Sequence, residues 1–596
     1  MRSKTIFKLR SLFLSPNSRL ELWLRTQYHR INKTRIAFLI SDWMARRSYI
    51  AWRSKQKQKP LRELKDTKNT PKITFIVSWD GRSNEDIVNT LQSLNTIEGE
   101  NWEAFLYSEH EDIQKQLPDG VDQDTHFRII NSVKDFFSKD LTGKFVVLCQ
   151  AGDQFDRDIL HHFFACHSEK DEVDWYYFDC EYRDDQKGTV TPLFKPPTLS
   201  PTLLISHNYL SRGFIRALFL KNHWESEGGN KTPLGLEYSL ALKLYENNAI
   251  VEHIPKVLVR QKSLVKPNTE HLQNIITTHL STSGLKDIST QSRPNGIWFR
   301  WKTSDPDIAV VIPTKNNKRL LSICLSSLIK KTDYQNFTIH IVDNNSDDPE
   351  TLNYYQELKS SESRIKIHPY RAEFNYSQAN NLGAAQSESK LLLFLNDDME
   401  VYDPNWLDEL VQWAERPEIG VIGAKLIRSN HIIQHAGIIM GLNGFTGHIY
   451  LNAPEHYQGL FGSVDWYRDY MAVTGACQMI RRKVFDEVDG FDEGYQLAFG
   501  DVDLCLRVRQ KGYRVVYSPH ASLFHYEGQS RGYSTPREDI IRSYDKMESI
   551  LSSDDPYFSP NLSYTGIPKC IVDDRREDER ESQFRERKKI YFKINE

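Results

Sequence analysis

Two adjacent carboxylates at the end of a short apolar run are the first residues of this chain that could do chemistry. Leu391 to Leu395 form the run, and Asn396, Asp397 and Asp398 follow it directly. Such a run is typical of a strand buried on both faces of a parallel sheet, and open α/β sheets bind ligands at the carboxyl ends of their strands. Paired carboxylates there suit Mg²⁺ or Mn²⁺ shared with a phosphate. The alternative is an acidic turn that caps a helix starting near Pro404.

Two earlier segments are also predicted to be strands that end at the same edge. Residues 308–317 (IAVVIPTKNN) are a buried strand that runs into a turn, and residues 337–348 (FTIHIVDNNSDD) are the next strand. We expect these strand ends to lie side by side and to form a pocket of nucleotide size. The backbone after Pro313 and the side chains of Asp343 and Asn344 could hydrogen-bond a base and a ribose there.

A second pair of acids occurs late in the chain. Asp501 and Asp503 open a predicted helix over Leu504 to Lys511. The alternative for both is helix capping, because the helix dipole favours Asp at a helix start. His525 follows the next predicted strand, and a single His among aromatic residues is more often structural than a ligand.

The elements that must position these groups alternate strand and helix, first over residues 71–262 and again over 306–550, with 263–305 as a linker. In the first half, the strand end that corresponds to Asn396–Asp398 reads Cys149 to Asp153 and keeps one acid. Residues Gly235 to Leu240 open a helix like the one at Asp501. The first half therefore reads as a repeat of the second with its chemistry eroded.

The start of the chain has a different composition. The chain has 596 residues and a net charge of −3, yet residues 1–60 hold many Lys and Arg against only Glu21 and Asp42. No apolar run there is long enough to span a bilayer, and none is typical of a cleaved signal peptide. Basic helices with aromatic and aliphatic faces suit an anionic membrane surface. The alternative is a helical segment, over residues 1–70, that packs on the protein. Nucleic acid is disfavoured because no reading motif accompanies the charge.

The cysteines predict the compartment. Seven are present, and none forms a CxxC pair. Most lie within apolar segments, where a free Cys behaves as a small buried hydrophobe. This usage predicts a reducing, cytoplasmic setting without structural zinc.

In order and spacing, the motifs resemble glycosyltransferase family 2, the inverting nucleotide-sugar enzymes with the GT-A fold. The matching pieces span residues 308–535 and are VVIPTKNN, IVDNNSDD, FNYSQANNLGAA, LLLFLNDDMEV, IQHAGIIMG, AVTGACQMIRRKVFDEVDGFDE, DVDLCLRVRQKGYRVVYSPHA and LFHYEGQSRG. Bacterial cell-surface polysaccharide transferases of the rhamnosyltransferase or O-antigen kind are the most similar, and they often carry a related domain in front. The pieces ITFIVS, ENWE, FKP…SP…NYL and HIPKVLVR make residues 71–262 look like that domain.

The resemblance implies a role for each site residue. Asp398 would bind the divalent cation, Mg²⁺ or Mn²⁺, with Asp397 on the ribose or the metal and His525 as a further ligand. Asp501 would be the general base, with Gly475 and Asp503 on the acceptor side. The implied donor-nucleotide contacts are Pro313, Thr314, Lys315, Asp343, Asn344 and Asp397.

Two departures from the family pattern stand out. Relatives commonly have Glu or Asn before the base, where this chain has Gly500, so that an acceptor contact is missing or is supplied by Asp503. Many relatives have paired acids where this chain has Asp343 and Asn344, which leaves thymine and guanine open beside uracil as the donor base.

The sequence thus predicts two tandem GT-A-type α/β domains behind a basic helical segment, with residues 551–596 as a charged tail. The predicted activity is metal-dependent, inverting sugar transfer from a nucleotide-diphospho-sugar to a hydroxyl of a glycan or lipid-linked acceptor in cell-surface polysaccharide synthesis. The predicted place is the cytoplasm or the inner face of the cytoplasmic membrane, reached through residues 1–60. Two other readings stay open: a noncatalytic carbohydrate-binding or scaffolding protein, and a nucleotidyltransferase.

Overall fold

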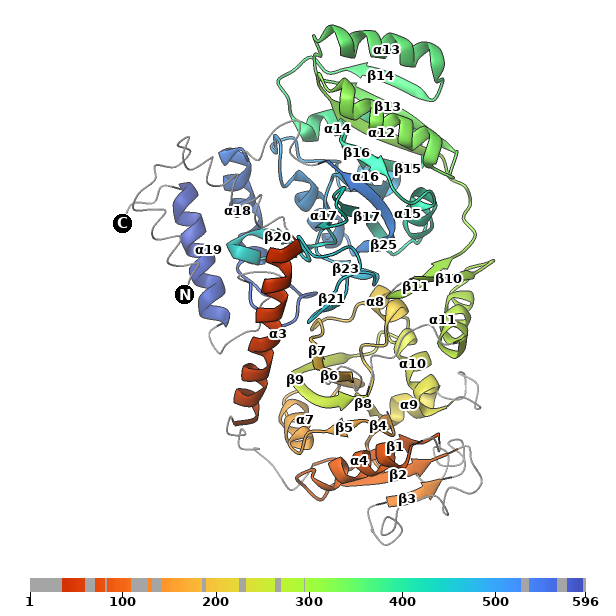
Figure 1. Cartoon of the computed structure of the whole chain (residues 1–596), viewed down its shortest axis with the longest axis vertical. Helices are drawn as coiled ribbons and strands as arrows, with labels where there is room; N and C mark the ends of the chain where they lie inside the picture. Colours follow the sequence, from red (N-terminus) through yellow and green to blue (C-terminus); the bar gives the residue numbers. More distant parts are fainter. Residues whose placement is uncertain are drawn as a thin grey trace.

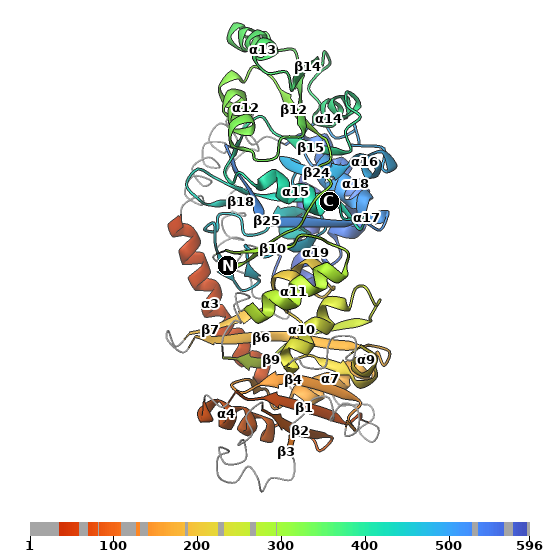
Figure 2. The ribbon, with the colours of Figure 1, turned by 90° about the vertical axis from the view of Figure 1, so that its right-hand side faces the viewer.

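Two α/β domains stacked end to end make an elongated molecule, with the first half of the chain at the bottom and the second half at the top (Figures 1 and 2). The computed structural model describes residues 35–58, 70–80, 83–108, 127–130, 141–184, 189–223, 232–262, 270–293, 295–526, 535–564 and 576–592. Within these ranges no helix combines the length and the hydropathy of a membrane span. The predicted basic segment before residue 35 lies outside the described residues.

The first domain is built on a nine-stranded sheet of order β3-β2-β1-β4-β8-β6-β9-β5, with β7 beside β6. Its central strands β1, β2 and β4 are parallel and almost wholly buried, which explains their unbroken apolar sequences. The strands are β1 (Ile73–Ser78), β2 (Trp102–Tyr107), β3 (Phe127–Ile130), β4 (Phe145–Gln150), β5 (Gln154–Phe155), β6 (Trp175–Asp184), β7 (Thr189–Leu193), β8 (Phe214–Arg216) and β9 (Val251–Gln261).

The second domain has a ten-stranded sheet of order β14-β13-β12-β15-β24-β17-β25-β16, with β18 beside β17 and β23 beside β25. The strands are β12 (Ile308–Thr314), β13 (Phe337–Asp343), β14 (Ile365–Pro369), β15 (Leu391–Leu395), β16 (Met399–Val401), β17 (Ile419–Ile427), β18 (Ile433–His435), β23 (Arg468–Tyr470), β24 (Cys477–Arg481) and β25 (Arg514–His525). Short hairpins pair β19 (Ile438–Met440) with β20 (Thr446–His448) and β21 (Gln458–Gly459) with β22 (Gly462–Ser463).

The two sheets share one topology. In each, the first three strands (β1, β2 and β3, or β12, β13 and β14) are parallel neighbours, and the first of them also pairs with the fourth (β4 or β15). An antiparallel strand (β8 or β24) then joins the fourth to a second parallel pair (β6 and β9, or β17 and β25). The short strand after the fourth closes the far edge antiparallel in both domains. The predicted repeat, with β4 as the counterpart of β15, is therefore confirmed at the level of the fold.

Helices cover both sheets. Along α12, Leu321, Leu325 and Leu328 are buried at the predicted spacing. The helices of the first domain are α4 (Asn84–Asn95), α7 (Ile159–His167), α8 (Pro201–Ser206), α9 (Ala217–His223) and α10 (Pro233–Lys243). Those of the second are α12 (Lys318–Lys331), α13 (Pro349–Ser361), α14 (Tyr376–Ala385), α15 (Trp406–Ala414), the 3₁₀ turn η3 (Leu442–Gly444), α16 (Arg482–Glu487), α17 (Gly500–Gln510), α18 (Arg537–Leu551) and α19 (Arg576–Phe592).

Residues between the domains are more ordered than a plain linker. They form α11 (Glu270–Thr282), as predicted, and then a hairpin of β10 (Ser289–Arg293) and β11 (Gly296–Arg300). Trp298 of this hairpin is buried and donates to Glu409 of α15. The hairpin thus belongs structurally to the second domain.

The FKP…SP…NYL segment joins the two domains. The Ser200 and Thr202 hydroxyls donate to Asp469 of β23, at 2.6 and 2.7 Å. The same carboxylate accepts from Arg514 at 2.8 Å and is fully buried. Farther along, the His207 ring stacks on Trp466 with centroids 4.6 Å apart. This motif therefore has a structural task, because its polar groups fix the interface.

Helix α3 (Arg35–Gln58) runs along the side of both domains (Figure 1). Tyr49 donates to Glu181 of the first domain, and Asp42 accepts from Tyr457 of the second at 2.5 Å. Of the two readings left open by the sequence, packing on the protein therefore holds for one face of α3. The other face is exposed.

Candidate active site

The ends of β12 and β13 lie side by side, as predicted. Thr314 is paired in register with Asp343, the last residue of each strand. Asp397, just after β15, is buried and accepts from the Thr314 hydroxyl at 2.6 Å and from the Asn317 amide at 2.9 Å. Asn317 was not among the predicted residues, although its place in the VVIPTKNN turn is a usable signal. Three chain segments thus converge on one carboxylate.

The predicted nucleoside end is held by its own hydrogen bonds. Asp343 accepts from the Tyr355 hydroxyl at 2.9 Å, and Asp343 itself is half-exposed. Asn344 is buried, and its amide donates to the carbonyls of Tyr370 and Ala372 at 3.2 and 2.9 Å. The Asn344 side chain therefore fixes the loop after β14 and has little left to offer a base.

The two loops that follow these strands are tied together. Asn316 and Asn345 both adopt left-handed backbone, with φ of 48° and 52°, which Asn tolerates better than most residues. The Asn316 side chain donates to Asp347 at 2.6 Å and accepts from the Asp347 backbone at 2.9 Å. Lys315 is exposed next to this bridge, and Pro313 is buried within β12. The loops form a fixed rim around the strand ends.

Asp398 and His525 meet just after β15. Asp398 directly precedes β16 and His525 ends β25, and these two strands pair antiparallel with Met399 opposite His525. His525 Nε2 lies 3.2 Å from Asp398 Oδ1, and both side chains are almost wholly buried. The sequence named both residues as metal ligands, and the structure brings them together.

Asp501 lies on the first turn of α17. The preceding Phe499 has a left-handed backbone with φ of 68°, a strained conformation for a large side chain. One carboxylate oxygen of Asp501 accepts from the Gly475 backbone at 2.7 Å, and the other accepts from Val502 at 2.9 Å. Burial nevertheless raises the pKa of Asp501 above its ordinary value. The carboxylate is therefore fixed in direction and is a stronger proton acceptor than a solvated Asp.

Position 475 has little room for a side chain, because it lies close to both Tyr376 and Asp501. A Cβ atom there would lie 2.9 Å from the Tyr376 hydroxyl and 3.0 Å from Asp501 Cβ. Tyr376 also donates to the Gly475 carbonyl at 2.8 Å, so both polar groups of this peptide are engaged. Tyr376 was not predicted as a site residue, although it lies in the FNYSQANN motif.

Gly500, the departure from the family pattern, has a steric explanation. A Cβ atom at this position would lie 2.8 Å from the buried Ser377 hydroxyl. No hydrogen-bond partner for that hydroxyl occurs among the described residues. The space that a larger residue would need at position 500 is therefore taken by α14.

Asp503 lies in a separate set of contacts. Its carboxylate pairs with Arg507 at 2.7 Å and with Lys546 of α18 at 3.2 Å. These two cations neutralise it and direct it along the α17–α18 contact. The acceptor-side role of Asp503, one of the two possibilities left by the glycine at position 500, stays a prediction.

The corresponding place in the first domain is closed by an arginine. Asp153 precedes β5 as Asp398 precedes β16, and Gly152 stands where Asp397 would be. Glu237 of α10 accepts from the Arg212 backbone at 2.7 Å, as Asp501 accepts from Gly475. The Arg212 guanidinium lies 2.6 Å from Asp153 and 3.9 Å from Glu237, and all three side chains are buried.

The residues of the second domain fit a divalent cation that is completed by other ligands. Asp398 and His525 offer an oxygen and a nitrogen ligand at one point. Among the described residues, no three His, Cys, Asp or Glu side chains are gathered closely enough to hold a metal alone. Mg²⁺ and Mn²⁺ sites that serve phosphate chemistry commonly take the remaining ligands from the substrate and water.

Comparison with known proteins identifies the second domain. Residues 309–489 match the family described as Glycosyl transferase family 2. The second domain is a family 2 glycosyltransferase domain. The predicted resemblance is thereby confirmed, and the repeated sheet topology supports the predicted fold class of two tandem GT-A-type domains.

Two curated relatives extend the match through the first domain. The chain is 30% identical over 522 residues to the O-antigen biosynthesis protein RfbC of Myxococcus xanthus, covering 83% of this chain and 40% of the relative. It is 29% identical over 559 residues to the uncharacterized protein y4gI of Sinorhizobium fredii, covering 88% and 60%. The chain thus spans about half the length of these relatives. Among solved structures, GalNAc-T7 with UDP, GalNAc and Mn2+ has a TM-score of 0.35 at 18% identity, covering 48% of this chain and 56% of that one.

Proposed function

We propose that the second domain transfers a sugar, with inversion, from a nucleotide-diphospho-sugar to a hydroxyl of a glycan or lipid-linked acceptor in cell-surface polysaccharide synthesis. The observation that supports this most is that two acidic groups lie beside the end of β15 in a family 2 domain. One is the Asp398–His525 pair, and the other is Asp501 at Gly475, which precedes Ala476, whose carbonyl accepts from the Asn396 N–H at 3.0 Å. A scaffolding protein would not need a glycine at position 475 to admit a buried carboxylate.

In the proposed reaction, Asp501 is the general base. It accepts the proton of the acceptor hydroxyl while that oxygen attacks the anomeric carbon and the nucleotide diphosphate leaves. A positioned base typically contributes about 10²–10⁴-fold in rate. The Gly475 and Val502 N–H groups hold the carboxylate in one orientation, so the reaction does not have to bear the entropic cost of orienting it. Because the base acts deprotonated, turnover falls as the pH drops through its raised pKa.

Asp398 and His525 would hold the divalent cation, which supplies positive charge to the leaving diphosphate. Asp397 faces the other way, toward Thr314 and Asn317, and we assign it to the donor ribose. Pro313, Thr314, Lys315, Asp343 and Asn344 form the rim around the nucleoside. In this rim, Asp343 and the backbone after Thr314 contact the base, while Asn344 supports the loop.

The protein is proposed to work at the inner face of the cytoplasmic membrane. Five large apolar side chains of α3 are at least half exposed, and the most exposed are Trp43 at 58% and Ile50 at 70%. The five are Leu39, Ile40, Trp43, Met44 and Ile50. Trp43 and Ile50 lie two helical turns apart, on one face. Exposed Arg47, Lys55 and Lys57 add the charge that attracts anionic headgroups.

The membrane contact is tested by vesicle sedimentation. Trp43→Ser with Ile50→Ser should lower recovery on anionic phosphatidylglycerol vesicles, whereas Leu218→Ser, another exposed apolar residue, should not. Equal recovery of the parent protein, the double variant and Leu218→Ser would show that α3 does not contact the membrane.

The transfer reaction is tested by a donor screen. Purified protein is incubated with UDP-, GDP- and dTDP-sugars, with Mn²⁺ or Mg²⁺, and release of the nucleoside diphosphate is followed. We expect one donor class to be consumed, and we expect both EDTA and Asp398→Asn to abolish the release. Turnover that persists in EDTA would contradict the metal assignment, and no consumption of any donor would favour the scaffolding role.

A further inference from the structure

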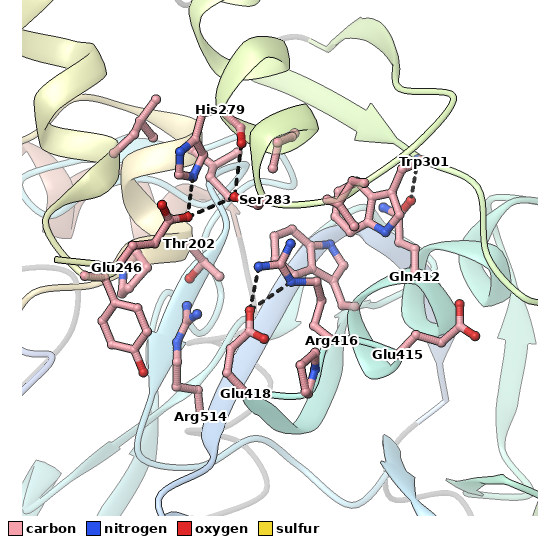
Figure 3. A pocket seen from close by; sticks show the side chains of 18 of the residues that line it. Thr202, Glu246, His279, Ser283, Trp301, Gln412, Glu415, Arg416, Glu418 and Arg514 are labelled. Carbon is pink, nitrogen blue, oxygen red and sulfur yellow. Dashed lines mark hydrogen bonds and ion pairs between the residues drawn. The ribbon is translucent and has the colours of Figure 1, made fainter. Parts of the chain in front are cut away.

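A cavity of about 600 Å³ lies where the two domains meet (Figure 3). One wall comes from α8, α10 and α11, and the other comes from α15, the turn after it and the start of β25. The volume falls within the range of about 300–1,000 Å³ that is typical of organic ligand sites, and domain interfaces are a preferred place for them. Neither domain could form this cavity alone.

The cavity is remote from the active site. Arg514 lines it and is the first residue of β25, whereas His525 is the last residue of the same strand. Because β25 bulges between Ser518 and Ser522, its two ends lie about eight strand steps apart, which is roughly 26 Å. A ligand in this cavity is therefore not the group that reacts at Asp501.

Charged side chains line the cavity, and each of its three cations has a carboxylate nearby, which for Lys302 is Asp287 at 4.0 Å. Arg514 is held by the buried Asp469 at 2.7 Å, and Arg416 is held by Glu418 at 2.8 Å. Glu246 accepts from Ser283 at 2.9 Å and lies 3.9 Å from His279. Because the positive groups are already neutralised, the cavity has no surplus charge with which to hold a diphosphate.

These groups still offer hydrogen bonds to a neutral ligand. The Arg514 Nε donates to Asp469, whereas Nη2 makes no hydrogen bond of good geometry among the described residues, although it lies 2.7 Å from the same carboxylate. Glu246 and Arg514 come from opposite walls, and Figure 3 shows both on the same side of the view. A ligand with several hydroxyls can donate to the first and accept from the second.

Aromatic and apolar surfaces complete the lining. Trp301 and Trp413 pack edge to face with centroids 5.1 Å apart, and Tyr245 is 45% exposed at the rim. Rings of this kind pack against the C–H faces of a sugar while hydroxyls point to polar groups. Trp413 and Trp301 are only 2% and 7% exposed, so the aromatic surface that a ligand can reach is mainly that of Tyr245, whose ring also lies 5.5 Å from the Arg514 guanidinium. The lining therefore combines one exposed aromatic ring with paired hydrogen-bonding groups.

We propose that this cavity binds a short neutral stretch of the acceptor glycan, away from the reacting end. That the bound glycan is the acceptor rests on the proposed transferase function, whereas the binding of a neutral oligosaccharide does not. Such a site would retain a growing glycan between transfers and would favour longer acceptors over short ones.

Binding is tested on the full chain with short neutral oligosaccharides of glucose, galactose, mannose or rhamnose, by saturation-transfer NMR and calorimetry. We expect Tyr245→Ala and Glu246→Gln each to weaken binding by about tenfold or more. Leu218→Ala, which removes an exposed apolar side chain outside the cavity, should not change it, and neither should Asp501→Asn. Both cavity positions are exposed, so neither variant should prevent folding.

Three results would overturn the inference: no binding of any neutral oligosaccharide, binding unchanged by both cavity variants, or binding lost equally in Asp501→Asn. A protein that binds these sugars through Tyr245 but consumes no nucleotide-sugar would keep the cavity site and refute the transferase. A transferase with unchanged acceptor-length preference in Tyr245→Ala would refute the retaining role.

Discussion

The two domains carry the same sheet and helix at their acidic sites, but they balance the acids differently. In the first domain, Arg212 lies between Asp153 and Glu237: it pairs with Asp153, and burial raises the pKa of Glu237 to about 8, so that Glu237 is mostly uncharged at neutral pH. In the second domain the residue equivalent to Arg212 is Gly475, which brings no guanidinium to Asp501 and lies against the Tyr376 hydroxyl instead. The exchange of arginine for glycine therefore separates acids with an internal cation from acids without one.

This difference explains why the first domain can keep acids without chemistry. Buried carboxylates that lack a partner are costly, so an internal guanidinium makes them part of the core. The backbone differs too: Arg212 is held at φ of 65°, a conformation that few non-glycine residues adopt. We propose that the second domain instead leaves its charge to be balanced by a bound cation and a substrate.

The largest effect is expected at the proposed base. Asp501→Asn keeps the shape and the contacts to Gly475 but removes the proton acceptor, so turnover should fall by about 10²–10⁴-fold with donor binding nearly unchanged. Steady-state kinetics with the consumed donor, together with nucleotide titration, measures both. A collapse of donor affinity would instead make Asp501 a binding residue.

The next effect is on stability, in the first domain. Arg212→Met keeps most of the volume but leaves the buried Asp153 carboxylate without its cation, which should cost about 3–5 kcal/mol of unfolding free energy. Urea denaturation of the full chain measures this. Arg542→Met, which breaks the partly exposed pair with Asp492, should cost less than about 1 kcal/mol. If the two variants were equally stable, Arg212 would not be the internal counter-charge.

A smaller loss is expected at the glycine. Gly475→Ala adds a methyl group 3.0 Å from Asp501 Cβ and should shift the base by a few tenths of an ångström. Displacements of about 1 Å can cost 10²-fold, so we expect roughly a tenfold fall in turnover. Thermal stability should change little. Full activity in this variant would show that the position of Asp501 is not critical.

The smallest effect is expected at the first-domain acid. Glu237→Gln removes the charge of the Asp501 counterpart and keeps its size and its contact with the Arg212 backbone. Transfer should stay within about a few-fold of the parent, a change of under ~1 kcal/mol in barrier. Loss of one of two separable transfer activities would mean that the protein is bifunctional.

Much of the fold could be predicted, because strands buried in a parallel sheet have short, continuous apolar sequences that can be recognised locally. β1 and β15 follow their predicted segments, and the acids after β15 lie where strand ends must bind. The segment from Met471 is rich in apolar residues, but β24 begins only at Cys477, because the peptide at Gly475 turns toward Asp501. Apolar sequence alone does not reveal such a turn.

The rest depends on contacts between distant residues. The approach of His525 to Asp398 depends on the register of β16 and β25, which no local pattern specifies. Arg212 gave no signal, since a lone arginine in a loop becomes a counter-charge only when the fold encloses it. The resemblance to a family supplied the roles of Asp398 and Asp501, whereas the closure of the first domain needed the structure.

The central claim is that one site of the two is open to a metal, and counting bound Mn²⁺ tests it most directly. Full-length protein is titrated with Mn²⁺ in the presence of the nucleoside diphosphate of its donor, and free Mn²⁺ is followed by electron paramagnetic resonance. We predict one tightly bound Mn²⁺ per chain, lost in Asp398→Asn and retained in Asp501→Asn. Two bound ions per chain, or one that survives in Asp398→Asn, would contradict the account.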